Sequence, residues 1–269
     1  MIIRILNITA YRTDAPEMFG AFHILTALAA AAAAAAGAFA ARKLTDAGRC
    51  RLLFFAGVFL LVTEIYKQLF LYYIVNDQIF DWWFLPFQLC SVPMYLCLLL
   101  PFTRPEGILR KAFYTFLAGY AFVGAAASLI WPEDFLRPYL SLTLHGFVWH
   151  GILLFISLLA AFSDMTDYSA KGQARAAGLF TALSCIAVII NVIAEPRMAA
   201  AYSAGGIEHN YAAMFYLNPY HYSSQPIVST VQSHAGIAAG LILYMLAVIA
   251  AAWICSSLIC RLSHSGQNK

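Results

Sequence analysis

Residues 139–162 read YLSLTLHGFVWHGILLFISLLAAF, and this stretch decides the class of the protein. It contains no Lys, Arg, Asp or Glu and is long enough to cross the roughly 30 Å apolar core of a bilayer as one helix. Two ionisable side chains, His145 and His150, nevertheless lie inside it. Such groups are costly in hydrocarbon unless they face a partner or a wet cavity, so they are functional candidates. The stretch predicts a membrane helix that does more than anchor the chain.

Six further stretches have the same apolar character, and the composition of the whole chain agrees with them. The chain is 62% hydrophobic and 11% charged, with a mean hydropathy of +0.74, unlike a soluble domain. We predict an all-α polytopic membrane protein, a single domain over residues 1–269 with seven transmembrane helices. The predicted spans are 19–41, 52–75, 84–102, 110–131, 139–162, 174–195 and 235–260. The small net charge of +3 gives no indication of nucleic-acid binding.

The Lys and Arg residues are distributed unevenly between the two sides of these spans. One side holds Arg42, Lys43, Arg49, Arg51, Arg104, Arg110, Lys111, Lys171, Arg175, Arg261 and Lys269, whereas the other holds Arg4, Arg12, Arg137 and Arg197. The positive-inside rule then places the amino terminus outside and the carboxyl terminus in the cytoplasm. We expect a multi-pass protein of the plasma membrane, specifically a bacterial inner membrane. Residues 1–18 lack the long apolar core of a signal peptide and are predicted to lie at the membrane interface.

Polar groups concentrate in the outer halves of four predicted spans. At about 1.5 Å per residue, Cys90 and His145 each lie roughly 9 Å from the outer end of their helices, and His150 roughly 17 Å. By the same count Glu64 lies roughly 16 Å and Asn191 roughly 6 Å from the outer ends of theirs. The inner halves of these spans are almost purely apolar. This asymmetry predicts a cavity that opens toward the outer leaflet.

The third span places a thiol beside a proline. Pro93 has no N–H, so the carbonyl of Leu89 loses its helical partner and a kink is expected there. Gln88 and Ser91 flank Cys90, which gathers polar groups around the thiol. Two interpretations remain open. Cys90 is either a small residue that fills a kink or a nucleophile, which would need a neighbouring base because only the thiolate attacks.

The two histidines of the fifth span are the candidate bases. Because they are five residues apart, they point about 140° from each other and do not form one ligand pair. Depth favours His145 as the neighbour of Cys90, whereas His150 would need helix tilt or the kink. A packing role is the alternative, since Gly146 and Gly151 permit close helix approach. No His, Asp or Glu shows metal-ligand spacing, and we predict neither a metal nor a cofactor.

Two further regions have open interpretations. Glu64, Lys67 and Gln68 share one face of the second span and can satisfy one another. They form either a paired polar stripe that sets helix register or a site that binds a zwitterionic headgroup or relays a proton. The long outer loop 196–234, which includes Asn210 and Tyr211, is either an interfacial aromatic belt or a lid over the cavity.

Four short motifs resemble those of the YwaF-like integral membrane proteins. Leu85-Pro-Phe-Gln-Leu-Cys90-Ser is similar to the family's Pro-Leu-His-Leu-Cys-Ser, with Gln88 in place of the His. Ile130-Trp-Pro-Glu-Asp134 resembles its Thr-Pro-Asp turn, and Phe147-Val-Trp-His150-Gly-Ile-Leu its Phe-Ile-Ser-His-Gly segment. Asn210-Tyr211 with Met214-Phe215 resembles an Asn-Tyr-Met-Phe stretch. The order of motifs and helices matches over about residues 50–260.

This family includes transmembrane protein 164, a phospholipid acyltransferase with a cysteine centre. The resemblance implies that Cys90 is the nucleophile and that His150 is the base. The expected function is then acyl transfer to a lysolipid, or acyl hydrolysis of a membrane phospholipid, with Gln88 or Ser91 near the oxyanion. The alternative is a non-catalytic lipid or small-molecule carrier or sensor that binds at Glu64 and Lys67. The sequence leaves the oligomeric state open.

Overall fold

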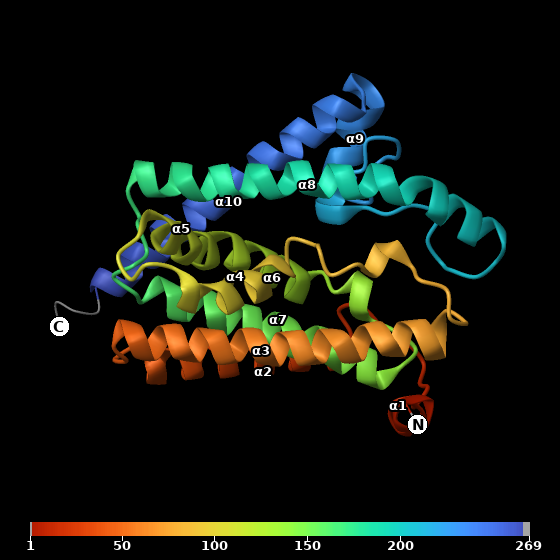
Figure 1. Cartoon of the computed structure of the whole chain (residues 1–269), viewed down its shortest axis with the longest axis horizontal. Coiled ribbons are helices and arrows are strands. Elements are labelled where there is room, and N and C mark those ends of the chain that lie inside the picture. The colour runs from red at the N-terminus through yellow and green to blue at the C-terminus, as the bar shows by residue number, and fades with distance from the viewer. Residues whose placement is uncertain (1, 266–269) are drawn as a thin grey trace.

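A computed structural model describes residues 2–265, and within that range the chain forms helices and no strand. The α-helices are α1 (Ile2–Thr9), α2 (Ala21–Ala41), α3 (Asp46–Phe70), α4 (Val92–Leu99), α5 (Ile108–Phe116), α6 (Phe122–Ile130), α7 (Leu140–Ala161), α8 (Ala170–Ser203), α9 (Pro226–Ala235) and α10 (Ile237–Ser265). Short 3-10 or π turns are η1 (Leu71–Val75), η2 (Trp82–Phe84), η3 (Leu100–Phe102), η4 (Leu117–Ala121), η5 (Glu133–Phe135) and η6 (Met214–Tyr216). Helices α3 and α8 run along the long axis of the molecule, whereas α10 crosses it obliquely (Figure 1).

Six helical segments of the described chain are long and apolar enough to cross a bilayer. They are Ala21–Ala41, Asp46–Val75, Ile108–Ile130, Leu140–Ala161, Ala170–Ser203 and Ile237–Arg261. A helix satisfies every backbone polar group within one segment, which is why long apolar stretches in lipid take this form. These segments coincide with six of the seven predicted spans and confirm the all-helical, polytopic class.

The predicted helix over 84–102 is wrong in its first half. Residues 85–91 are irregular, and α4 begins only at Val92. Pro86 explains part of this, because it biases the residue before it away from the helical region. Pro93 falls in the first turn of α4, where a missing N–H removes no helical hydrogen bond. The expected proline kink is therefore replaced by an unwound segment that leads into a short helix.

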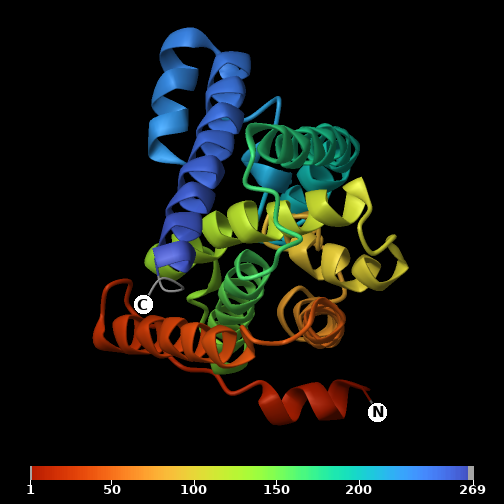
Figure 2. The same cartoon turned by 90° about the vertical axis from the view of Figure 1, so that its left-hand side faces the viewer.

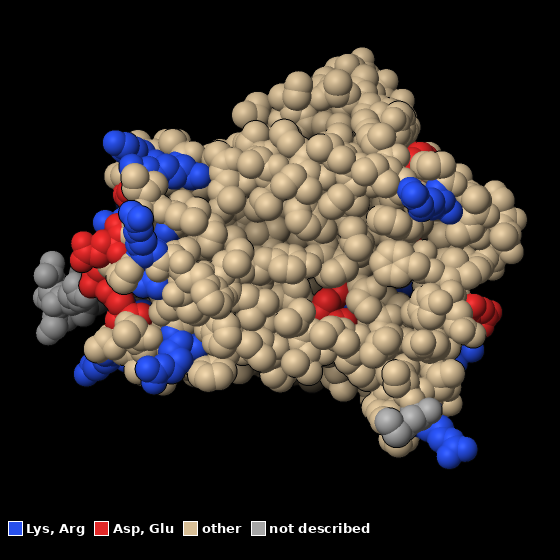
Figure 3. All heavy atoms as spheres, in the orientation of Figure 1, with Lys and Arg blue, Asp and Glu red and all other residues tan. Residues whose placement is uncertain are grey.

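Polar caps start two helices at one end of the bundle. Thr45 accepts a hydrogen bond from the amide of Gly48 (3.2 Å) at the start of α3, and Ser169 accepts one from Gly172 (3.1 Å) at the start of α8. Such caps satisfy amides that have no partner within the helix. Loops 42–45, 103–107 and 162–169 lie at this end, where most Lys and Arg atoms gather (Figure 3). We call it the basic end.

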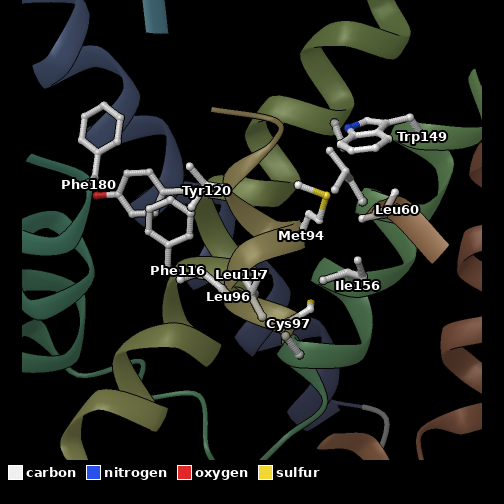
Figure 4. Close-up of a cluster of buried hydrophobic side chains, with 14 of the residues drawn as sticks. Leu60, Met94, Leu96, Cys97, Phe116, Leu117, Tyr120, Trp149, Ile156 and Phe180 are labelled. Atoms are coloured by element: carbon white, nitrogen blue, oxygen red, sulfur yellow. The ribbon is translucent and has the colours of Figure 1, made fainter. Parts of the chain in front are cut away.

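Buried apolar side chains form one main cluster through the bundle. Side chains from α3, α4, η4, α7 and α8 meet in it, among them Leu60, Met94, Leu117, Ile156 and Phe180 (Figure 4). A Cβ added to Gly57 would lie 2.9 Å from the Cβ of Cys97, so α3 and α4 cross at close range. Gly151 on α7 is similarly close to Ala30 on α2. Small residues at these crossings permit the approach, as is common in membrane bundles.

The predicted outer loop 196–234 is partly helical. Helix α8 continues through Pro196 to Ser203, and residues 204–225 are irregular apart from η6. Helix α9 then packs beside the start of α10 (Figures 1 and 2). Residues 76–91, 131–139 and 204–225 all lie opposite the basic end, and we call this the cavity end.

Candidate functional site

A cavity of about 590 Å³ is lined by helix segments and irregular segments of the cavity end. Its volume is typical of sites for small molecules. The walls come from α3, residues 83–91, α6, the loop before α7, α7 itself, η6, residues 224–225 and α10. Among the residues singled out from the sequence, the cavity brings together Lys67, Gln88, Cys90, Ser91, His145 and His150. Glu64, Asn191, Asn210 and Tyr211 are not among its lining residues.

Cys90 lies in the irregular segment, one residue before the N-cap of α4. It is partly buried and lines the cavity. Its carbonyl accepts a hydrogen bond from the indole Nε1 of Trp149 (3.2 Å), and the carbonyl of Pro86 accepts one from the hydroxyl of Tyr95 (2.7 Å). Buried backbone groups need such partners when no helix supplies them. Side chains of α7 and α4 thus hold the unwound backbone that carries the thiol.

His150 has one ring nitrogen fixed and the other free. Its Nδ1 lies 2.8 Å from the carbonyl oxygen of Gly146. Because a carbonyl oxygen only accepts, Nδ1 carries the proton in the neutral ring and Nε2 keeps its lone pair. Nε2 is buried and has no hydrogen-bond partner, so it does not bond to the thiol of Cys90. The ring stacks on Phe135, 4.9 Å between centroids. This is the protonation state that a general base requires.

His145 lines the same cavity one and a half turns earlier on α7. Its Nε2 is also buried without a hydrogen-bond partner. Its ring lies against Trp149, with 5.4 Å between the ring centroids. Both candidate bases therefore line the cavity that contains Cys90. Depth along the helix, which favoured His145, does not decide which of the two acts as the base.

The polar stripe on α3 pairs internally, as the sequence predicts. The Oε1 atom of Glu64 lies 2.9 Å from Nζ of Lys67 and accepts a hydrogen bond from Nε2 of Gln68 (2.7 Å). Gln68 also donates to the carbonyl of Phe84, which ties α3 to η2. Glu64 is buried, and its Oε2 has no partner. Only the ammonium end of this stripe reaches the cavity, because Lys67 lines it and Glu64 lies behind.

Asn191 and Gln88 hold the backbone of η6. The side-chain amide of Asn191 accepts from the N–H of Met214 (2.7 Å) and donates to the carbonyl of the same residue (3.2 Å). Gln88 accepts from the N–H of Phe215 (2.9 Å) with its side-chain oxygen. Phe215 and Tyr216 have positive φ angles of 56° and 58°, which cost energy outside glycine. These two amides therefore position a strained turn, and the oxygen of Gln88 is already engaged.

Three cavity-wall residues were not assigned to the site from the sequence. Tyr216 donates a hydrogen bond to Oδ2 of Asp134 (2.8 Å). Burial, and secondly the charge of Asp134, raise the pKa of Tyr216 well above its ordinary value, so it stays a donor. Arg137 pairs with Glu208 (2.8 Å) and lies over the ring of Phe84. Asp134 belongs to the motif at residues 130–134 that the sequence already singled out. Arg137 stood out in the sequence only as one of the four basic residues on the outer side.

The segment 204–225 is tied to the bundle by two histidine–carboxylate contacts. His209 lies 2.9 Å from Oδ2 of the buried Asp81 and stacks on Trp83, a residue of the cavity wall. His221 lies 2.6 Å from Oε1 of Glu195. Each contact joins the segment to a different part of the chain, so the segment is held over the cavity end at two points.

The predicted lid residues lie beside one of these contacts. Tyr211 stacks on the ring of His221, with 4.3 Å between centroids. Asn210 is exposed. Neither lines the cavity. This segment reaches the cavity through Phe215, Tyr216, Ser224 and Gln225.

Comparison with known protein families supports the resemblance seen in the sequence. The sequence model of the TMEM164 family matches residues 18–256. The chain belongs to the TMEM164 family. The matched range contains all six helical spans up to the last residues of α10, together with Cys90 and His150. Comparison with curated proteins and with solved structures found no match.

The site of this TMEM164-family protein has the ingredients of nucleophilic chemistry. No group of three His, Cys, Asp or Glu side chains among residues 2–265 is arranged to hold a metal ion. The cavity instead combines a thiol, two imidazoles with free nitrogens and an ammonium group. A thiol and a neighbouring base are the two groups that cysteine-centred nucleophilic catalysis uses.

Proposed function

We propose that this TMEM164-family protein transfers or hydrolyses acyl groups of membrane phospholipids, with Cys90 as the nucleophile and His150 as the base. The observation that supports this most directly is the shared cavity, in which Nε2 of His150 is free while Nδ1 is fixed by Gly146. The family resemblance assigns the same two residues. Catalytic hydrogen bonds often form only when substrate is bound, so the absence of one between thiol and imidazole is compatible with this role.

The reaction has two balanced halves. In the first, His150 takes the proton of the Cys90 thiol, the sulfur attacks the ester carbonyl carbon, and the bond from that carbon to the glycerol oxygen breaks. The imidazolium returns its proton to the departing lysolipid, and a thioester remains. In the second, His150 deprotonates a lysolipid hydroxyl or water, which attacks the thioester, and the proton goes back to sulfur. Ser91 is the flanking side chain proposed to meet the oxyanion.

The same proposal includes an orientation in the membrane. Residues 85–102 provide a seventh crossing, half irregular and half helical, which lines a cavity as non-helical backbone at membrane depth must. The basic end faces the cytoplasm, the amino terminus lies outside and the cavity opens toward the outer leaflet. Helix α1 then lies at the interface, and residues 204–225 act as the lid.

The decisive experiment is intact mass spectrometry of the purified protein after incubation with phospholipid in nanodiscs. We expect an added acyl mass that maps to Cys90, that is absent in Cys90→Ser and that hydroxylamine removes. Cys185→Ser is the matched control, because Cys185 is exposed on α8 and lies outside the cavity. Acyl mass that persists in Cys90→Ser, or its absence under all conditions, would contradict the proposed chemistry.

A non-catalytic carrier or sensor is the second candidate, and the position of Lys67 favours it. Its ammonium lines the cavity, held by the buried Glu64, and is suited to a phosphate group. A carrier would keep phospholipid binding in Cys90→Ala and lose it in Glu64→Gln. The enzyme would lose acyl transfer in Cys90→Ala while keeping its fold.

A further inference from the structure

The cavity walls differ in polarity from one part to another. Glu133, Asp134 and Arg137 lie at the rim, in the loop between α6 and α7. Cys90 and the two histidines line a second part. A third part of the wall, which we call the α6–α10 wall, carries no charge and consists of Val123, Gly124, Ala127, Ser128, Tyr244 and Val248. Gly124 lies six residues before the end of α6 at Ile130, roughly 9 Å deeper than the rim.

Gly124 is a glycine that packing does not require. A Cβ added there would meet no heavy atom within 4 Å. By contrast, a Cβ on Gly146 would overlap the ring of Phe135, and one on Gly119 would come within 2.6 Å of the hydroxyl of Ser256. Glycine inside a helix is less stable than alanine by about 1 kcal/mol. Gly124 differs from Gly178, a helical glycine that also has open space around it, in that its open space belongs to the cavity.

The α6–α10 wall also reaches the surface of the bundle. Ala127 is both a lining residue and exposed. On α10, the exposed Leu246 lies between the lining residues Tyr244 and Val248. Exposed faces of spanning helices meet the acyl chains of the bilayer. A lipid chain can therefore reach this wall sideways, from within the membrane.

We propose that the α6–α10 wall holds the fatty-acyl chain of a phospholipid and that Gly124 sets how bulky a chain the cavity accepts. This inference rests on the proposed acyl-transfer site. A phospholipid presents a charged headgroup, then its esters, then apolar chains. The cavity presents a part suited to each: charged groups in the α6–α7 loop, the thiol and imidazoles, and the α6–α10 wall.

The first test places a larger side chain in the open space beside Gly124. Gly124→Leu places a bulkier side chain against the cavity, where its Cβ meets no heavy atom within 4 Å, and should lower thioester formation from an oleoyl phospholipid about tenfold or more. An octanoyl phospholipid, whose chain ends sooner, should be affected about twofold or less, and Gly124→Ala should be intermediate for the long chain. Gly178→Leu is the matched control, since a Cβ on Gly178 also meets nothing within 4 Å, and this residue of α8 does not line the cavity. Equal behaviour of the two leucine variants with both lipids would overturn the proposal.

The second test needs no catalysis. A phospholipid with a diazirine near the methyl end of its chain is photolysed with Cys90→Ala, and crosslinked peptides are identified by mass spectrometry. We expect crosslinks on residues 123–127 or 244–248 that are lost with Gly124→Phe and kept with Gly178→Phe. Crosslinks there without any thioester in the native chain would refute the enzyme and leave the acyl site standing. Thioester formation with crosslinks elsewhere would refute the acyl site, and neither signal would refute both.

Discussion

The half of the bundle toward the basic end and the half that contains the cavity differ in how closely neighbouring helices surround two of their glycines. Toward the basic end, a Cβ on Gly57 would lie 2.9 Å from the Cβ of Cys97, whereas toward the cavity end one on Gly124 would find nothing within 4 Å. The cavity half contains the unwound residues 85–91, whose backbone is held by the side chains of Trp149 and Tyr95. The cavity lies where residues 85–91 form irregular backbone in place of a helix and where neighbouring helices hold that backbone.

The largest expected effect distinguishes the two histidines of the cavity half. His150→Gln removes the base and should slow Cys90 acylation by about 10²–10⁴-fold. His145→Gln removes the second imidazole of the cavity, which the family resemblance does not assign as the base, and should slow it less. Single-turnover acylation followed by mass spectrometry measures both. A larger loss in His145→Gln would reassign the base to His145.

The next largest effect concerns the ion pair between Lys67 and Glu64 in the cavity half. Lys67→Met leaves the buried Glu64 without its counter-ion and should destabilise the protein by about 3–5 kcal/mol. The double variant Lys67→Met/Glu64→Gln should recover most of that loss, because no buried charge remains unpaired. Unfolding in denaturant in detergent micelles measures the difference. Equal stability of the single and double variants would show that the pair is screened by solvent.

The same substitution in both halves compares their packing directly. Gly57→Leu overpacks the α3–α4 crossing and should cost about 1–3 kcal/mol. Gly124→Leu should not destabilise the protein, because glycine is a poor helix former and leucine a good one. Thermal unfolding in detergent measures both variants. Similar losses at the two positions would mean that the cavity half is closed in solution.

The smallest expected effect concerns the hydrogen bond that holds the unwound segment. Trp149→Phe keeps an aromatic ring but removes the donor to the carbonyl of Cys90, which should cost about 0.5–1.5 kcal/mol. The freed backbone should make the thiol of Cys90 react faster with maleimide, while that of Cys185 on α8 keeps its rate. An unchanged rate at Cys90 would indicate that other contacts suffice to hold residues 85–91.

Hydropathy predicted six of the spans because a long apolar stretch in lipid must satisfy its own backbone. It failed at 84–102, since apolar character does not distinguish a helix from irregular backbone held by neighbours, and Pro93 suggested a kink where it begins a helix. The pairing within the α3 stripe was predictable because it needs only local spacing. The roles of Gln88 and Asn191 were not, because both bind η6, far along the chain.

The sequence by itself determined that this is a helical membrane protein with titratable groups inside its spans, because hydropathy and helical spacing are local properties. Its motifs also singled out Cys90 and His150. Only the tertiary structure decided that they share a cavity, that Lys67 faces it while Glu64 does not, and that Gly124 borders open space. A cavity is the volume that distant segments leave unfilled, and no single segment specifies it.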